Sequence, residues 1–135
     1  MKPITLFYTL LLLLIALHSL AQVPTSNLYL IDYLRAPSGI YKFSHPSFLT
    51  YDNQNSYNNQ PYFEGEELYY TAIRDGEQTD IFKCNVATRS RTQMTNTRES
   101  EYSPKMMPDG EHFSVVRVTA DSTAAQQLWL SLIHI

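Results

Sequence analysis

The sequence has little of the chemistry on which catalytic and nucleic-acid-binding proteins depend. Its 135 residues include one cysteine, four glycines and four histidines, and the formal net charge is −3. No basic run provides the positive surface that nucleic acids require. No Gly-x-Ser-x-Gly elbow is present, glycine is too scarce for a phosphate-binding loop, and no histidine spacing suggests a metal site. We therefore expect no nucleic-acid partner, no cofactor, no metal and no catalytic residue.

The few residues that could support catalysis are better explained by structure. His45 precedes a proline and fits a turn, and His112 opens a predicted strand, where a half-exposed position suffices. The acidic residues within 64–67 surround a glycine, so their charge keeps a hairpin turn solvated. Cys84 lies in an alternating segment that places it on one strand face, and the sequence holds no partner for it. We expect a buried, unreactive thiol.

The N-terminus has the three-part layout of a secretory signal peptide. Lys2 supplies a positive start, residues 4–17 are almost entirely apolar, and small residues precede a cleavage site after Ala21. A membrane anchor would need about 20 apolar residues, and His18 and Ser19 interrupt the run too early. We therefore predict that residues 1–21 are a signal peptide. The mature protein should be periplasmic or secreted and should have no stable membrane anchor after cleavage.

The residues that remain are dominated by a repeat between 59 and 129. Its first copy begins with Gln60-Pro61-Tyr62-Phe63, followed by Gly65. The second copy begins with Ser103-Pro104-Lys105-Met106, followed by Gly110. Aligning Gly65 with Gly110 separates the copies by 45 residues (110 − 65 = 45). This period matches the repeat of about 40–45 residues in four-stranded propeller blades.

The first copy predicts four short strands, at 60–63, 67–73, 79–86 and 92–95. Gly65 and the Asp75-Gly76 pair should form the hairpin turns, because both suit the positive φ of tight turns. The second strand is apolar or aromatic on both faces, which suits a sheet that is covered on both sides. The second copy has the same spacing, and no helical period appears after the signal peptide. The fold class is therefore all-β, a partial β-propeller of about two to two and a half four-stranded antiparallel blades.

The flanking segments are less regular. Residues 27–33 and 40–43 are predicted strands joined by a turn at 35–39, and 44–59 is predicted to be a loop. Residues 22–58 would thus hold the outer strands of a partial blade and a loop, 59–97 a full blade, and 98–129 a truncated blade. Residues 130–135 form an apolar tail that resembles the translation of a sequencing adapter, so we expect it to be non-native. A closed propeller needs at least about four blades, so the chain is expected to be incomplete.

Three segments carry a family resemblance: residues 57–63, 80–82 and 107–111. They resemble the WD40-like repeats of TolB-type six-bladed β-propellers, although Phe63-Glu64-Gly65 lacks the usual Ser-Pro-Asp before glycine. The resemblance implies an exported, non-catalytic platform that binds a protein or carbohydrate partner. One alternative is the propeller part of an exported peptidase or other hydrolase whose catalytic domain lies outside this sequence. Another is a small, independent β-protein.

In a propeller, the loops that lead from blade to blade share one face with those joining the second and third strands of each blade. Mixed charges and tyrosine on such a face could hydrogen-bond a peptide or a glycan. The predicted binding residues on this face are Tyr51, Asp52, Asn53, Arg74, Asp75, Glu77, Arg98, Glu99, Glu101 and Tyr102.

The signal-peptide prediction is tested by expressing the gene in a bacterium with an intact export system. We expect N-terminal sequencing and mass spectrometry of the exported protein to place Gln22 first, because cleavage should follow Ala21. A protein that keeps Met1 and sediments with membranes would contradict the prediction.

Overall fold

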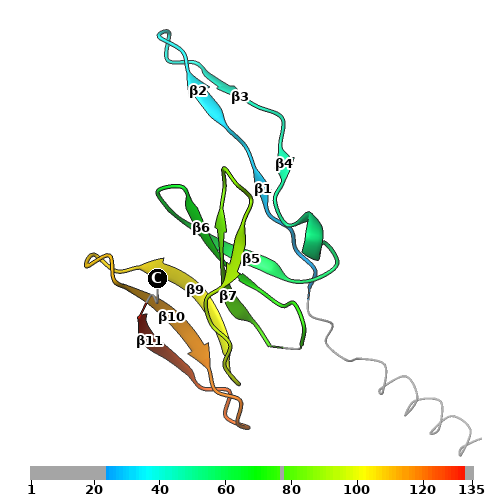
Figure 1. Ribbon diagram of the computed structural model, residues 1–135, viewed down its shortest axis with the longest axis vertical. Coiled ribbons are helices and arrows are strands. Elements are labelled where there is room, and N and C mark those ends of the chain that lie inside the picture. The colour runs from blue at the N-terminus through cyan, green and yellow to red at the C-terminus, as the bar shows by residue number, and fades with distance from the viewer. Residues whose placement is uncertain (1–23, 77, 133–135) are drawn as a thin grey trace, which may run out of the picture.

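The computed structural model describes residues 24–76 and 78–132 (Figure 1). Within these residues the chain forms antiparallel strands and one turn of 3₁₀ helix, η1 (Tyr51–Asn53), so the all-β prediction is confirmed. No helix among them is long and apolar enough to cross a membrane. The predicted signal peptide (1–21), Glu77 and the last three residues of the predicted tail lie outside the described residues.

The predicted full blade is a four-stranded antiparallel sheet, here called the first sheet. Its strands lie in sequence order, β5 (Asn58–Glu64), β6 (Glu67–Ala72), β7 (Asp80–Asn85) and β8 (Arg91–Gln93). The prediction of a loop through residue 59 is wrong at its end, because Asn58 already belongs to β5. The buried side-chain amide of Asn58 donates to the carbonyl of Asn53 at 2.8 Å, and this bond holds the start of β5 in place.

The second sheet repeats the pairing of the first. It contains β9 (Ser100–Met106), β10 (His112–Val118) and β11 (Gln126–Leu132) in the order β11-β10-β9. Tyr70 lies opposite Phe82 in the first sheet, and Val115 lies opposite Trp129 in the second, as the repeat alignment predicts. Residues 130–132 of the predicted tail continue β11 and remain paired with β10.

The hairpin turns confirm one turn prediction and correct the other. Gly65 (φ 59°) and Gly110 (φ 72°) both adopt the left-handed conformation that favours glycine. Gly76 does not, so a tight turn at Asp75-Gly76 is wrong. Strand β6 ends at Ala72 and β7 begins at Asp80, so the connection between them is longer than a tight two-residue turn.

Strand β6 is covered on both faces, as its lack of alternation predicts. Leu68 and Tyr70 pack on one face with Leu49, which lies in the segment leading to η1. Thr71 is fully buried on the other face, toward the second sheet. Cys84 is also fully buried and belongs to the same apolar cluster as Leu49, Leu68 and Tyr70, which confirms the expected buried thiol. Burial raises the pKa of that thiol and so disfavours the reactive thiolate.

The first strand of each sheet contains the same irregularity. Gln60 and Ser103 both have φ of 53°, each precedes a proline, and the strand register shifts beside each of them. A non-glycine residue in this conformation costs about 1–2 kcal/mol, so it persists only where other contacts hold it. Oε1 of Gln60 accepts hydrogen bonds from the backbone N–H of Ser103 at 2.8 Å and from the Thr71 hydroxyl at 3.1 Å. The side chain at one bulge therefore binds the backbone at the other.

The N-terminal part is a narrow ribbon that extends away from both sheets (Figure 1). Strands β1 (Tyr29–Leu30) and β4 (Ser47–Phe48) pair, and β2 (Tyr33–Arg35) and β3 (Tyr41–Phe43) pair beyond them. The prediction of one strand over 27–33 is wrong at 31–32, where the strand is interrupted, and the predicted loop over 44–59 contains β4. The ribbon's aromatic and aliphatic side chains are largely exposed.

A buried ion pair lies where the second sheet meets the first. Glu101 of β9 is 1% exposed, and its Oε1 lies 2.6 Å from Nη2 of Arg117 on β10. The backbone N–H of Glu101 donates to the carbonyl of Thr79 at 2.8 Å. Because water cannot solvate this carboxylate, the charged form of Glu101 is stabilised by the guanidinium of Arg117.

We expect Arg117→Ala to lower the free energy of unfolding by about 3–5 kcal/mol, because the substitution leaves a buried carboxylate unpaired. Chemical denaturation followed by far-UV circular dichroism measures the loss. Arg98→Ala, at an exposed arginine, is the control and should change the free energy by no more than about 0.5 kcal/mol. Equal effects of the two substitutions would contradict the role of the ion pair.

Candidate functional site

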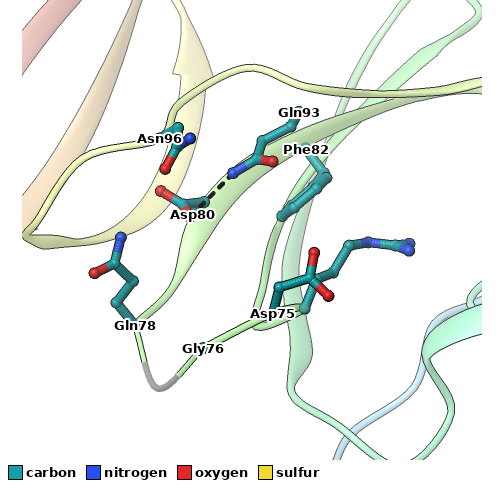
Figure 2. Close-up of a pocket in the computed structure, with 8 residues that line it drawn as sticks. Asp75, Gly76, Gln78, Asp80, Phe82, Gln93 and Asn96 are labelled. Atoms are coloured by element: carbon teal, nitrogen blue, oxygen red, sulfur yellow. Dashed lines mark hydrogen bonds between the residues drawn. The ribbon is translucent and has the colours of Figure 1, made fainter.

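A cavity of about 310 Å³ opens at the edge of the first sheet, where the β6–β7 loop meets the segment after β8. We call it the loop cavity (Figure 2). Its volume lies at the lower end of the range of about 300–1,000 Å³ for ligand pockets. The lining is mainly polar and consists of Arg74, Asp75, Gly76, Gln78, Asp80, Phe82, Gln93 and Asn96.

Asp80 is the buried carboxylate of the loop cavity. It is the first residue of β7 and is 8% exposed. Nε2 of Gln93 donates to its Oδ2 at 3.2 Å, which Figure 2 shows as a dashed line. Burial raises the pKa of Asp80 above its ordinary value, and the negative charge of Glu101 acts in the same direction. The Thr95 hydroxyl donates to Oδ1 of Asp80 at 3.5 Å, so each carboxylate oxygen has one protein donor and can accept a further hydrogen bond.

Arg74 forms the wall of the loop cavity nearest η1. Its Nη2 lies 3.0 Å from Oδ2 of Asp52, and its guanidinium lies over the Phe82 ring, 5.1 Å from the centroid. Asp52 also lies 3.3 Å from Nη2 of Arg91. The charge of Arg74 is therefore already paired, and its position is set by a carboxylate and an aromatic ring.

Two side chains at the cavity remain open for hydrogen bonding. Asp75 and Asn96 are exposed, and no hydrogen bond joins either side chain to another group in the described parts of the chain. Gln78 differs, because its Nε2 donates to the carbonyl of Thr97. A carboxylate accepts hydrogen bonds, and a carboxamide both donates and accepts. The open groups therefore suit a polar ligand with several hydrogen-bonding atoms.

The predicted binding residues of the first loops lie together. Tyr51, Asp52 and Asn53 form η1, and Arg74 joins them through Asp52. Tyr51 is 58% exposed, whereas Asn53 uses its side chain to donate to the carbonyl of Ile73 at 2.8 Å. Asn53 thus has a structural role in holding η1 against the sheet.

The predicted residues near the second sheet are distributed differently from the expectation. Glu99 lies 3.4 Å from Nε of Arg117, and Arg98 is exposed. Glu101 was expected on an exposed loop but is buried, because β9 begins at Ser100. Tyr102 lines a separate cavity of about 350 Å³ between β5 and the second sheet. The expectation of an exposed position is therefore wrong for Glu101, and Tyr102 lies beside a different cavity from Arg74 and Asp75.

Sequence reasoning missed several residues that line the loop cavity. Asp80 and Phe82 were read only as strand residues of the repeat. A polar residue at the start of an otherwise buried strand is a signal for a buried acceptor and could have identified Asp80. Gln78, Gln93 and Asn96 come from irregular segments or a strand end, and no pattern in the sequence distinguishes them.

Comparison with protein-family models and with curated proteins gives no match for this chain. In residues 24–76 and 78–132, no group of three or more histidine, cysteine, aspartate or glutamate side chains is arranged to hold a metal ion.

Asp80→Asn tests the electrostatics of the loop cavity. The folded protein holds the Asp80 proton to higher pH than the unfolded chain does. The contribution of Asp80 to the free energy of unfolding is therefore greatest below the unfolded pKa of about 3.9 and falls as the pH rises through the folded pKa. Asparagine lacks this charge, so the variant should gain stability relative to the natural protein as the pH rises.

Denaturation curves between about pH 4 and about pH 7 measure this gain. Asp75→Asn, at an exposed carboxylate of the same cavity, is the control for the loss of one negative charge. A stability difference for Asp80→Asn that stays constant over this range would contradict the assignment.

Proposed function

We propose that the protein is an exported, non-catalytic binding scaffold built from TolB-like propeller blades, and that its loops bind a protein or saccharide partner in the cell envelope. The repeated strand geometry is the observation that carries this proposal. Two consecutive sheets share the turn glycine, the bulge before proline and the pairing between second and third strands. Such repetition is typical of propeller blades.

The arrangement of side chains supports a binding role for the loops. The segments of the repeat form strands and turns: Asp109, before the turn glycine of the second copy, accepts hydrogen bonds from the N–H groups of Glu111 and His112 at 2.9 and 3.0 Å. The loops, in contrast, present Tyr51, Asp75 and the loop cavity to solvent. Function in repeat scaffolds usually lies in such non-repeated loops.

The experiment places a photoactivatable phenylalanine analogue at one of two exposed aromatic positions. Tyr51 on η1 is 58% exposed, and Phe63 beside the Gly65 turn is 50% exposed. Because the two side chains are similarly exposed, only the position near the proposed binding loops should crosslink a partner. We expect a discrete crosslinked product in the exported fraction for Tyr51 and none for Phe63.

The loss of the product in an Arg74→Ala variant would support the loop face further, because Arg74 fixes Asp52 and thereby η1. Two outcomes would contradict the proposal: equal labelling at Tyr51 and Phe63, or no crosslinked product at Tyr51.

A further inference from the structure

We propose that the loop cavity binds one neutral sugar residue of a saccharide, with Asp75, Asp80 and Asn96 as its main hydrogen-bonding groups. The inference rests on the proposed binding function and names its ligand class. The cavity volume of about 310 Å³ limits the ligand to a small molecule or to one unit of a larger one.

The charges around the cavity argue against an anionic ligand. Asp75 and Asp80 supply two carboxylates, whereas the one arginine in the lining is already paired with Asp52 at 3.0 Å. An anion would therefore meet net repulsion. A hydroxyl group has no such penalty, because carboxylates accept hydrogen bonds from hydroxyl donors.

The amides of the cavity complement the carboxylates. Gln93 uses its Nε2 on Asp80 at 3.2 Å, which leaves its carbonyl oxygen as an acceptor. Asn96 supplies both a donor and an acceptor, and Figure 2 shows its side chain with those of Gln93 and Asp80 around the cavity. Neighbouring sugar hydroxyls each donate and accept, so this combination fits a ring that carries several of them. An apolar ligand would leave these groups without partners, which costs binding energy.

The matching loop of the second sheet is closed by its own side chains. The β6–β7 and β10–β11 connections span residues 73–79 and 119–125, and Asp75 and Asp121 each stand three residues after a strand end. Asp121 accepts hydrogen bonds from the Thr119 hydroxyl and the N–H of Thr123, both at 2.9 Å. The carboxylate of Asp75 has no such partner among the described residues. At matching positions after a strand, Asp121 closes its loop, whereas the Asp75 carboxylate faces the loop cavity without a hydrogen bond to residues 24–76 or 78–132.

The aromatic contribution to binding should be small. Phe82 is 5% exposed, and the Arg74 guanidinium lies over its ring. Binding of a single sugar therefore depends mostly on hydrogen bonds that compete with water, and we expect a Kd on the order of 1 mM. A longer saccharide would add contacts beyond the cavity, toward Tyr51 on η1.

The proposal is tested on the exported protein by saturation-transfer NMR and titration calorimetry. The probes are glucose, galactose, mannose and N-acetylglucosamine, with glucuronate as an anionic probe and 1,4-diaminobutane as a cationic probe. We expect at least one neutral sugar to bind, and glucuronate to bind at least about tenfold more weakly than that sugar. Asp75→Ala and Asn96→Ala should each weaken binding by about fivefold or more.

Both substituted residues are exposed, so the variants should keep the circular dichroism spectrum of the natural protein. Glu66→Ala, at an exposed carboxylate in the turn at the other end of the first sheet, should leave sugar affinity unchanged. The inference is overturned if no neutral sugar binds, if only the diamine binds, or if both cavity variants bind like Glu66→Ala. If the Tyr51 crosslink persists in those cases, the scaffold function stands with a protein partner and only the saccharide is rejected.

Discussion

The fold depends on covering both faces of β6. Because Leu68 and Tyr70 on one face and Thr71 on the other are all buried, this strand needs a layer on each side. One layer is the segment around Leu49, and the other is the second sheet. Each layer also positions residues of the candidate site. The Leu49 segment continues directly into η1, which places Asp52 beside Arg74. The second sheet brings Glu101 close enough for its negative charge to raise the pKa of Asp80.

The interface between the sheets combines apolar packing with polar contacts that specify position. Ile81, Phe113 and Val115 form its apolar cluster, and apolar packing alone tolerates sliding. The bond from the Ser103 N–H to Gln60 and the pairing of Glu101 with Arg117 require particular atoms to meet. These contacts set the offset between the sheets, at the cost of a strained backbone and a buried charge.

The sequence predicted the strands and hairpins of the repeat well, because their signals are local. Gly65 and Gly110 mark turns through backbone conformation, and the alternation around Cys84 identifies a buried face. The prediction failed where contacts between distant segments decide the structure. Strand β9 begins at Ser100 because Ser100 and Glu101 pair with Val118 and Arg117 of β10. The N–H of Glu101 also donates to the carbonyl of Thr79, which precedes β7, and no local pattern around Glu101 indicates that contact.

The candidate site was less predictable than the fold for a related reason. The repeat identified which residues build the strands and turns of the two sheets, and the residues left between them included the loop residues Arg74 and Asp75. It could not separate Asp75 from Asp121, although the two occupy matching positions. The threonines on either side of Asp121 supply the hydroxyl and N–H donors that close its loop, and no such bonds join Asp75 to the residues described around it. Asp121 and Asp75 therefore differ, within the described residues, in the hydrogen-bond donors that their neighbours supply, although the two aspartates stand at matching positions after a strand.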